Sequence, residues 1–526
     1  MNDFIARYSQ QLLGVLSGFD RLVLRGNLTG LAHDTGMRGY LWASGVAWKD
    51  YAKHVEAVSR RIKQASLESI AAQGRPVRYL ASGKESKEEM ARAIARQDGI
   101  TAGPVCAFTA VEPCLTWSVG GNRATGKLQL KQGMRKCLFI YHYWIDAVFG
   151  FMSARLQTWF PFPLYVYLNG REWLSRQMQQ AGMAYRQHDN CFSWIEDFPR
   201  AQQLMDQQLE TPWPEALEAC VARIHPLFPA LFEHYPVSYY WTSHQTEWAM
   251  DMVFRDPEQL RRLYPQLIHL GMTAFSSPDV MRFLGKKVGP SGTLRGSHSH
   301  EVISDRKVRQ EGVRIKHRHG KNSIKMYDKA YAETGAVLRS EVTINAPQQF
   351  RVFRHKASDP EGKMLWLPLR AGIADLHRRA EVSQKALDRY SNALAKVDGT
   401  TTLGELAASI ETRRHWHGRS VRALHPFEAG DLALLQAVNR GEFVINGLRN
   451  RDLQALLFAG TPASPAETRR RSAAVSRKLR MLRAHGILQK LPRTHRYQVT
   501  DQGRLILNTV LSAQRTTSQQ LTSLAA

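Results

Sequence analysis

Residues 321–345, KNSIKMYDKAYAETGAVLRSEVTIN, have the pattern of two β-strands joined by a short Glu-Thr-Gly turn. Apolar and β-branched residues alternate with polar residues on both sides of the turn, as expected for a β-hairpin. The preceding stretch GVRIKHRHG (312–320) shows the same alternation, so the sequence predicts three consecutive antiparallel strands. Strand and helix patterns also occur earlier, from FDRLVLRGNL (19–28) onward. Together they predict an α+β core with a mixed, largely antiparallel sheet and helical insertions.

The faces of this hairpin carry groups that suit phosphodiester chemistry. Because side chains alternate along a strand, Lys325, Tyr327 and Lys329 share one face. Arg339 and Glu341 share one face of the second strand for the same reason. A tyrosine can attack phosphorus, a carboxylate can hold a divalent metal ion, and cations can stabilise developing charge. The alternative is an exposed sheet face on which these residues form cross-strand ion pairs.

Length and charge bound the possible functions. The chain has 526 residues, which predicts two or three domains. Its 72 basic and 46 acidic residues give a formal charge of +26, which favours a polyanionic partner, usually nucleic acid. Five cysteines without a CxxC spacing indicate a reducing compartment. The N-terminus lacks a signal-peptide pattern and no stretch has the roughly 18 apolar residues of a membrane span. We therefore expect a cytoplasmic protein with no membrane association.

A cationic helix is predicted near the C-terminus, at residues 469–485, RRRSAAVSRKLRMLRAH. Val475, Leu479 and Leu482 give it an apolar stripe, and Gly486 can end it. The strand-like stretches ILQKL and RYQVT follow. Residues 426–512 therefore resemble a winged helix-turn-helix DNA-binding domain, whose recognition helix enters the major groove of duplex DNA. The alternative is a winged helix that contacts proteins through a solvated basic face.

The resemblance assigns contacts within this domain. It implies that one group of side chains on the helix contacts bases, a second contacts phosphates, and the wing carries further contacts. The base-contacting candidates are Ser476, Arg477 and Arg480, the phosphate candidates Arg469, Arg470 and Arg471, and the wing residues His495 and Arg496. Residues 411–526 hold 19 basic and 7 acidic residues, an excess of 12 positive charges that supports DNA as the partner.

The stretches IKMYDK and LRSE, within 324–341, resemble the tyrosine-bearing region of replication-initiator transposon-type proteins. This family includes rolling-circle plasmid initiators and conjugative relaxases with an HUH-like palm fold. The resemblance implies that Tyr327 is a nucleophile that nicks single-stranded DNA and that Lys329 and Arg339 are phosphate partners. It also implies that Glu341 is a ligand of Mg²⁺ or Mn²⁺.

Further metal ligands are candidates on other strands. His317 and His319 share a strand face, although Arg318 stands between them where the HUH motif has an apolar residue. Glu247 and Asp251 share one face of the stretch QTEWAMDMVF, and carboxylate pairs suit Mg²⁺ or Mn²⁺. Asp20 on the first strand is a further candidate. The alternatives are surface histidines, and carboxylates that pair with the many arginines.

The sequence thus predicts four parts: a palm-like α+β nuclease core at 1–374, a helical linker at 375–425, the winged helix at 426–512 and a flexible tail at 513–526. The function favoured is a DNA-binding protein of a plasmid or mobile element that nicks DNA through a phosphotyrosine intermediate. One alternative is a non-catalytic winged-helix regulator that binds DNA or structured RNA. The other is a transposase or nuclease with a carboxylate-bound metal ion and water as nucleophile. P-loop, GxGxxG, HExxH and GxSxG motifs are absent, which disfavours ATP hydrolysis, nicotinamide chemistry and serine hydrolysis.

Overall fold

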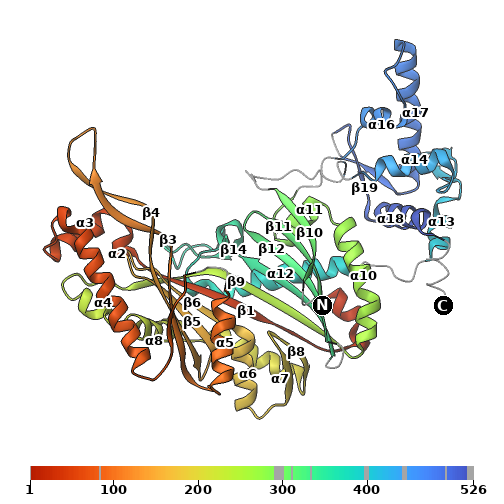
Figure 1. Cartoon of the computed structure of the whole chain (residues 1–526). Coiled ribbons are helices and arrows are strands. Elements are labelled where there is room, and N and C mark those ends of the chain that lie inside the picture. The colour runs from red at the N-terminus through yellow and green to blue at the C-terminus, as the bar shows by residue number, and fades with distance from the viewer. Residues whose placement is uncertain are drawn as a thin grey trace. The chain divides into compact units, whose positions relative to one another are not determined.

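The structure is a computed structural model of the 526-residue chain (Figure 1). It describes all residues except 1, 82–84, 289–300, 310–311, 332–334, 396–401, 441–442, 444–446, 492–493 and 518–526. The predicted hairpin turn and most of the predicted tail therefore lie outside the described residues. The chain forms two compact units. We call Gln11–Pro257 with Lys329–Lys385 the sheet unit, and Met1–Gln10 with Glu258–Asp328 and Ala386–Ala526 the C-terminal unit.

The sheet unit is organised around a long twisted sheet. Its strands are β1 (Leu12–Leu28), β2 (Val77–Tyr79), β3 (Gly103–Gly121), β4 (Leu128–Asp146), β5 (Gly150–Gln157), β6 (Leu164–Asn169), β9 (Tyr239–Phe254) and β13 (Gly335–Ile344). They lie side by side in the order β13-β9-β1-β6-β5-β4-β3-β2. Neighbours are antiparallel except β2 and β3, which are parallel. The predicted α+β fold with a largely antiparallel sheet is confirmed.

The strands β1 and β9 form the centre of this sheet. They pair along nearly their whole length, and Trp248, Met250 and Met252 of β9 are buried on one face. The ring of Trp248 packs edge-on against Phe19 of β1, with 4.9 Å between ring centroids. The pairing is irregular between Phe19 and Arg21, so β1 carries one extra residue, Asp20, at this point. Such β-bulges change the direction of a side chain.

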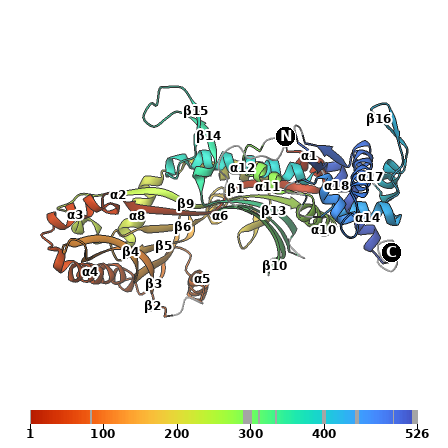
Figure 2. The ribbon, with the colours of Figure 1, turned by 90° about the horizontal axis from the view of Figure 1, so that it is seen from above.

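Helices and small hairpins cover the two faces of the sheet. The helices are α2 (Thr29–Ala32), α3 (Asp34–Ala43), α4 (Tyr51–Ala71), α5 (Lys87–Gln97), α6 (Gly170–Gln180), α7 (Phe198–Asp206), α8 (Trp213–Ile224), α9 (Phe228–Leu231) and α12 (Leu376–Leu394), the last of which continues into the C-terminal unit. The hairpins are β7 (Tyr185–His188) with β8 (Cys191–Ile195) and β14 (Arg351–Arg354) with β15 (Leu365–Pro368). Figure 2 shows α5 on one side of the strands β3 to β5 and the β14–β15 hairpin projecting on the other. The β7–β8 hairpin lies between the helices α6 and α7 in the chain.

The C-terminal unit contains two groups of elements. The first consists of α1 (Asp3–Arg7), α10 (Pro257–Thr273), α11 (Ser277–Phe283), β10 (Val302–Arg309), β11 (Gly312–His319) and β12 (Asn322–Tyr331). The strands β10, β11 and β12 are antiparallel neighbours, as predicted for β11 and β12. The last residues of β12 belong to the sheet unit, so this strand runs through the boundary between the units.

The second group has the element order of a winged helix. It consists of α13 (Leu403–Ile410), β16 (Arg414–Trp416), β17 (Arg419–Val421), α14 (Ala429–Val438), α16 (Asn450–Leu457), α17 (Pro465–Ala484), β18 (Leu488–Lys490), β19 (Tyr497–Val499) and α18 (Asp501–Arg515). The predicted stripe of α17 is buried in the core of this group, and Gly486 follows the helix with a φ of 72°.

The boundaries of this domain differ from the predicted ones. Leu406, Val421 and Leu424 belong to the same core as the stripe of α17, so the packed domain begins before residue 426. Residues 375–425 are therefore not only a linker, because α12 and α13 both bury apolar side chains. The helix α18 continues to Arg515, into the predicted tail, and buries Val510 and Leu511. All five cysteines are buried and none forms a disulfide, and no described helix has the length and apolarity of a membrane span.

A buried histidine makes the stability of the sheet unit depend on pH. His225 is fully buried, and its ring packs against Phe162 and Phe228 with 5.9 and 5.6 Å between centroids. Within the described part of the chain neither ring nitrogen has a hydrogen-bond partner. Burial lowers the pKa of His225 to about 3, whereas an unfolded histidine has a pKa of about 6.5.

The unfolded state therefore binds the proton first, so stability is complete above about pH 6.5 and declines as the pH falls toward 3. We expect the wild type to lose about 1.4 kcal/mol more unfolding free energy between pH 7.5 and 5.5 than His225→Phe. Urea unfolding followed by tryptophan fluorescence measures this difference. Identical pH dependence in the two proteins would contradict the prediction.

Candidate functional site

Three carboxylates from adjacent strands come together on one face of the sheet. They are Asp20 on β1, Glu247 on β9 and Glu341 on β13, and one oxygen of each lies within 4.8 Å of the others. Asp20 and Glu341 are buried and Glu247 is half-buried. No other group of three or more such ligands occurs among the described residues. The structure thus brings together two predicted ligands, Glu247 and Glu341, with the weaker candidate Asp20.

Strand pairing explains why these three side chains converge. Glu247 pairs directly with Thr343 of β13 and with Arg21 of β1, while Glu341 pairs with Ala249, two residues along β9. Alternation therefore places both glutamates on the same face. The bulge adds Asp20 next to Arg21 and turns its carboxylate toward this face. In a regular strand Phe19 and Arg21 would share one face, whereas the bulge places Phe19 opposite Trp248 and Arg21 opposite Glu247.

Asp20 is held in place through only one of its oxygens. Its Oδ2 accepts a hydrogen bond of 2.8 Å from Asn190 Nδ2 and lies 3.3 Å from Arg339 Nη1. Its Oδ1 is buried and has no hydrogen-bond partner in the part of the chain that the structure describes. A buried carboxylate oxygen without a partner needs an explanation, and a bound cation is one. Carboxylate oxygens at this separation fit the ligand distances of Mg²⁺ or Mn²⁺.

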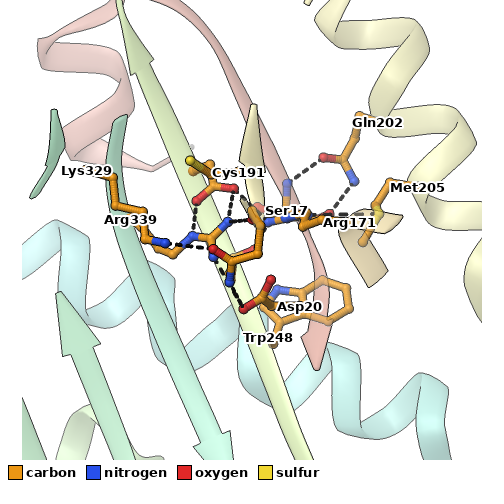
Figure 3. A network of polar contacts seen from close by, with 12 residues as sticks. Ser17, Asp20, Arg171, Cys191, Gln202, Met205, Trp248, Lys329 and Arg339 are labelled. Carbon is orange, nitrogen blue, oxygen red and sulfur yellow. Dashed lines mark hydrogen bonds and ion pairs between the residues drawn. The ribbon is translucent and has the colours of Figure 1, made fainter. Parts of the chain in front are cut away.

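A buried ion-pair network lies beside the carboxylate cluster (Figure 3). The guanidinium of Arg339 donates to both oxygens of Asp251, from Nε at 2.6 Å and from Nη2 at 2.8 Å. Arg171 of α6 donates to the same carboxylate at 2.9 Å. All three side chains are at most 1% exposed. Asp251, predicted as a metal ligand, is therefore a member of this ion-pair network and not of the carboxylate cluster.

The network favours the charged forms of Asp251 and Arg339. Burial alone would raise the pKa of Asp251, but Arg339 and Arg171 outweigh it and hold the pKa below its usual value. Burial likewise opposes the charge of Arg339, yet Asp251 and Asp20 keep the pKa of Arg339 well above its ordinary value. For Arg171 burial is the stronger effect, so its pKa is lowered.

The β7–β8 hairpin connects the network to the strand that carries Tyr327. Asn190, between β7 and β8, accepts a hydrogen bond of 2.7 Å from Lys329 Nζ and donates to Asp20. Its backbone carbonyl also accepts a hydrogen bond from Arg339 Nη2. Sequence reasoning missed Asn190 and Arg171. The His-Asp-Asn sequence at 188–190 is a turn signal between two short apolar stretches, which could have revealed this hairpin.

The predicted catalytic residues have different surroundings from those expected. Arg339 was predicted to hold a phosphate, but it is fully buried and its guanidinium binds protein carboxylates. Lys329 is buried and binds Asn190. Tyr327 is half-buried on β12, on the same strand face as Lys329 by alternation. Its role as nucleophile stays a prediction.

The predicted histidine ligands belong to the C-terminal unit and are buried. His317 Nδ1 lies 2.8 Å from Ser304 Oγ, and the ring packs against Phe275 and Tyr390. Burial lowers the pKa of His317 to about 4, so the ring is neutral at pH 7. His319 is 1% exposed. Neither histidine belongs to the carboxylate cluster found among the described residues.

Some of the predicted DNA contacts on α17 have exposed side chains, and others contact neighbouring residues of the protein. Arg469, Arg470 and Arg477 are exposed, and Arg480 is half-buried. Arg471 instead pairs with Glu467, one turn earlier, at 2.7 Å.

Ser476 is exposed, and its Oγ accepts a hydrogen bond of 2.9 Å from Asn450 Nδ2 on α16. This bond joins α16 to α17. On the wing, His495 is exposed and Arg496 is half-buried.

Comparisons with known proteins add no further information. No family model, curated protein or solved structure matches this chain.

Removal of Arg339 should strongly destabilise the sheet unit. Arg339→Met leaves Asp251 with one buried partner and removes a cation from Asp20, which should cost about 3–5 kcal/mol of unfolding free energy. Arg123→Met, at an exposed position of the same unit, is the matched control and should cost less than about 0.5 kcal/mol. Denaturant unfolding measures both variants. Equal stability of the two would show that the network contributes nothing.

Proposed function

We propose that this chain is a DNA-binding protein that cleaves DNA phosphodiester bonds with a divalent metal ion. The carboxylate cluster carries this proposal, because Asp20, Glu247 and Glu341 place three oxygens within 4.8 Å and Asp20 Oδ1 has no partner among the described residues. Three carboxylates this close repel one another unless a cation or a proton separates them. The formal charge of +26 supports a polyanionic substrate.

The residues of the cluster would bind the metal ion, and those around it would orient the ligands. Asp20, Glu247 and Glu341 are the ligands. Gln245 Nε2 donates to Glu247 Oε1 at 3.1 Å, which fixes the side chain of this half-buried glutamate. When bound, Mg²⁺ or Mn²⁺ would polarise a phosphate and stabilise charge on the leaving oxygen. Arg339 and Asn190 hold Asp20 from the side opposite to its unpartnered oxygen.

Two nucleophiles fit this proposal. Water is the nucleophile in the nuclease or transposase alternative, which requires only the carboxylates. Tyr327 is the nucleophile implied by the resemblance to rolling-circle initiators. It is supported by the alternation that puts Tyr327 on the same strand face as Lys329. A plasmid or mobile element is the origin that this resemblance favours.

The winged helix would bring the core to duplex DNA. Its support is the exposed cationic surface of α17, where Arg469, Arg470 and Arg477 project to solvent. The Asn450–Ser476 hydrogen bond positions α17 against α16 as a helix-turn-helix requires. A non-catalytic regulator would use the same surface, so cleavage decides between the two functions.

Cleavage should depend on the carboxylates and on a divalent metal ion. We expect the wild type with Mn²⁺ to nick supercoiled plasmid or circular single-stranded DNA, and EDTA to abolish nicking. Glu247→Gln removes a ligand charge and should slow cleavage by at least about 100-fold. Glu56→Gln, at an exposed position on α4, is the matched control and should cleave normally.

Tyr327→Phe identifies the nucleophile. If Tyr327 attacks, wild-type protein forms a DNA adduct that survives denaturation and the variant forms none. Cleavage by the variant at the wild-type rate assigns the reaction to water. Metal-independent cleavage, or no cleavage of either DNA form, would contradict the proposed function and favour the regulator.

Duplex binding should depend on exposed arginines of α17. Arg477→Ala should weaken binding by about 5- to 100-fold if the side chain contacts a base. Arg470→Ala should make the slope of log affinity against log salt concentration shallower by about one unit, as expected for the loss of one phosphate contact. The control Arg515→Ala removes the same charge from an exposed position of α18. Equal affinities of all three variants in fluorescence anisotropy would contradict DNA recognition by α17.

A further inference from the structure

The sheet face that carries the carboxylate cluster continues into a strip of arginine and aromatic side chains. Arg25 on β1 pairs with Tyr165 on β6, and Tyr165 pairs with Arg155 on β5. Cross-strand partners lie on the same face of a sheet. Arg21 pairs with Glu247, and alternation along β1 places Arg21 and Arg25 on that same face. The strip and the carboxylate cluster therefore share one surface.

Tyr165 lies at the centre of this strip. The guanidinium carbons of Arg25 and Arg155 each lie 5.4 Å from the centroid of its ring. The ring of His244 meets it edge-on at 5.5 Å. His244 is the extra residue of a second bulge, where β9 has one more residue than β1 between Val23 and Leu24. The two bulges thus direct Asp20 and His244 at the two ends of one surface.

This strip is partly open to solvent. Tyr165 and Tyr167 on β6 and Arg155 on β5 are half-buried, while the residues between them point into the core. Beside Tyr165 lies a cavity of about 380 Å³, lined by Arg25, Asn27 and Arg155. Exposed apolar side chains of the β3–β4 ribbon, Leu115 and Met134, form its wall. An exposed sheet face that carries aromatic and cationic side chains is a common surface for unpaired bases.

The charges of the strip favour a polyanion. Arg155 is paired with Glu112 at 2.9 Å, and Lys87 lies 3.2 Å from the same carboxylate, which neutralises this glutamate. No carboxylate in the described part of the chain forms an ion pair with Arg21 or Arg25. The Nε of Arg25 is buried and has no hydrogen-bond partner among the described residues. Arg25 as a whole is half-buried and forms no ion pair with a described carboxylate, so its charge is available to a phosphate of a bound strand.

We propose that this strip binds unpaired nucleotides of a DNA single strand and leads the strand to the carboxylate cluster. Bases would stack on Tyr165 and Tyr167, and Arg21 and Arg25 would hold successive parts of the backbone. Arg25 lies four positions after Arg21 on β1, which is about 13 Å along the strand. This inference rests on the proposed function for the chemistry at the cluster, but the binding itself requires no metal ion.

Binding of a fluorescein-labelled dT12 oligonucleotide in EDTA tests the strip. We expect Tyr165→Ala and Arg25→Ala in the full-length protein each to weaken binding by about five- to tenfold. Tyr165→Phe keeps the ring and should bind like the wild type. Tyr79→Ala removes an exposed tyrosine from β2 and is the matched control. Arg477→Ala should leave dT12 binding unchanged, which separates the strip from α17.

A second readout does not depend on variant stability. Ultraviolet cross-linking of the wild type to a 5-iodouracil-containing oligonucleotide should place the adduct on Tyr165, Tyr167 or His244. Normal dT12 affinity of Tyr165→Ala, or an adduct confined to α17 and the wing, would overturn the inference. Glu247→Gln should keep full dT12 affinity and lose cleavage. If Tyr165→Ala and Arg25→Ala bind dT12 like the wild type while the wild type still cleaves DNA, the strip alone is refuted. If these variants bind dT12 weakly as expected but the wild type does not cleave DNA, the proposed function alone is refuted.

Discussion

A buried guanidinium ties three strands of the sheet together at its centre. Arg339 of β13 binds Asp251 of β9 through two parallel hydrogen bonds and lies 3.3 Å from Asp20 of β1. Charges are buried at a high cost unless they are paired, and this arrangement pairs them. The same contacts keep the three strands in register at the point where Glu341, Glu247 and Asp20 converge. The geometry of the carboxylate cluster therefore depends on Arg339.

Burial differs between three regions of this one face of the sheet. Where α6 and the β7–β8 hairpin cover the face, Arg171, Arg339 and Asp251 are closed off and act as structure. At the cluster, Glu247 is half-buried, whereas Asp20 and Glu341 are buried. Beyond the cluster, Arg25 of β1 and Tyr165 of β6 are half-buried. In the function that we propose, this more open part of the face would bind the DNA strand and the cluster would bind the metal ion.

Much of this arrangement could be predicted from the sequence, because it follows from alternation. Two features depend only on the two-residue alternation of side chains along a strand. They are the strands β9, β11, β12 and β13 themselves and the convergence of Glu247 with Glu341 on one face. Asp20 could not be placed with the same certainty, because its direction depends on a bulge that no local pattern marks. The role of Arg339 was mistaken for a phosphate contact because alternation gives the face but not what covers it.

Contacts between segments that are distant in the chain could not be predicted from the sequence. Arg171 and Asn190 lie about 80 and 150 residues from Asp251 and Arg339 in the chain, and only the folded sheet brings them together. His317 and His319 share a face as predicted, but that face is buried, with His317 packed between aromatic rings and held neutral by its lowered pKa. Alternation therefore predicts neighbours on a strand, whereas burial decides whether they can bind a ligand.

The most direct test of this account is the position of a bound metal ion. A crystal of the full-length protein soaked in Mn²⁺ and measured near the manganese absorption edge gives an anomalous difference map. We expect a single strong peak about 2.2 Å from the carboxylate oxygens of Asp20, Glu247 and Glu341. The free oxygen of Asp20 should be one of its ligands. A map without a peak at this cluster, with the three carboxylates well ordered, would contradict the account.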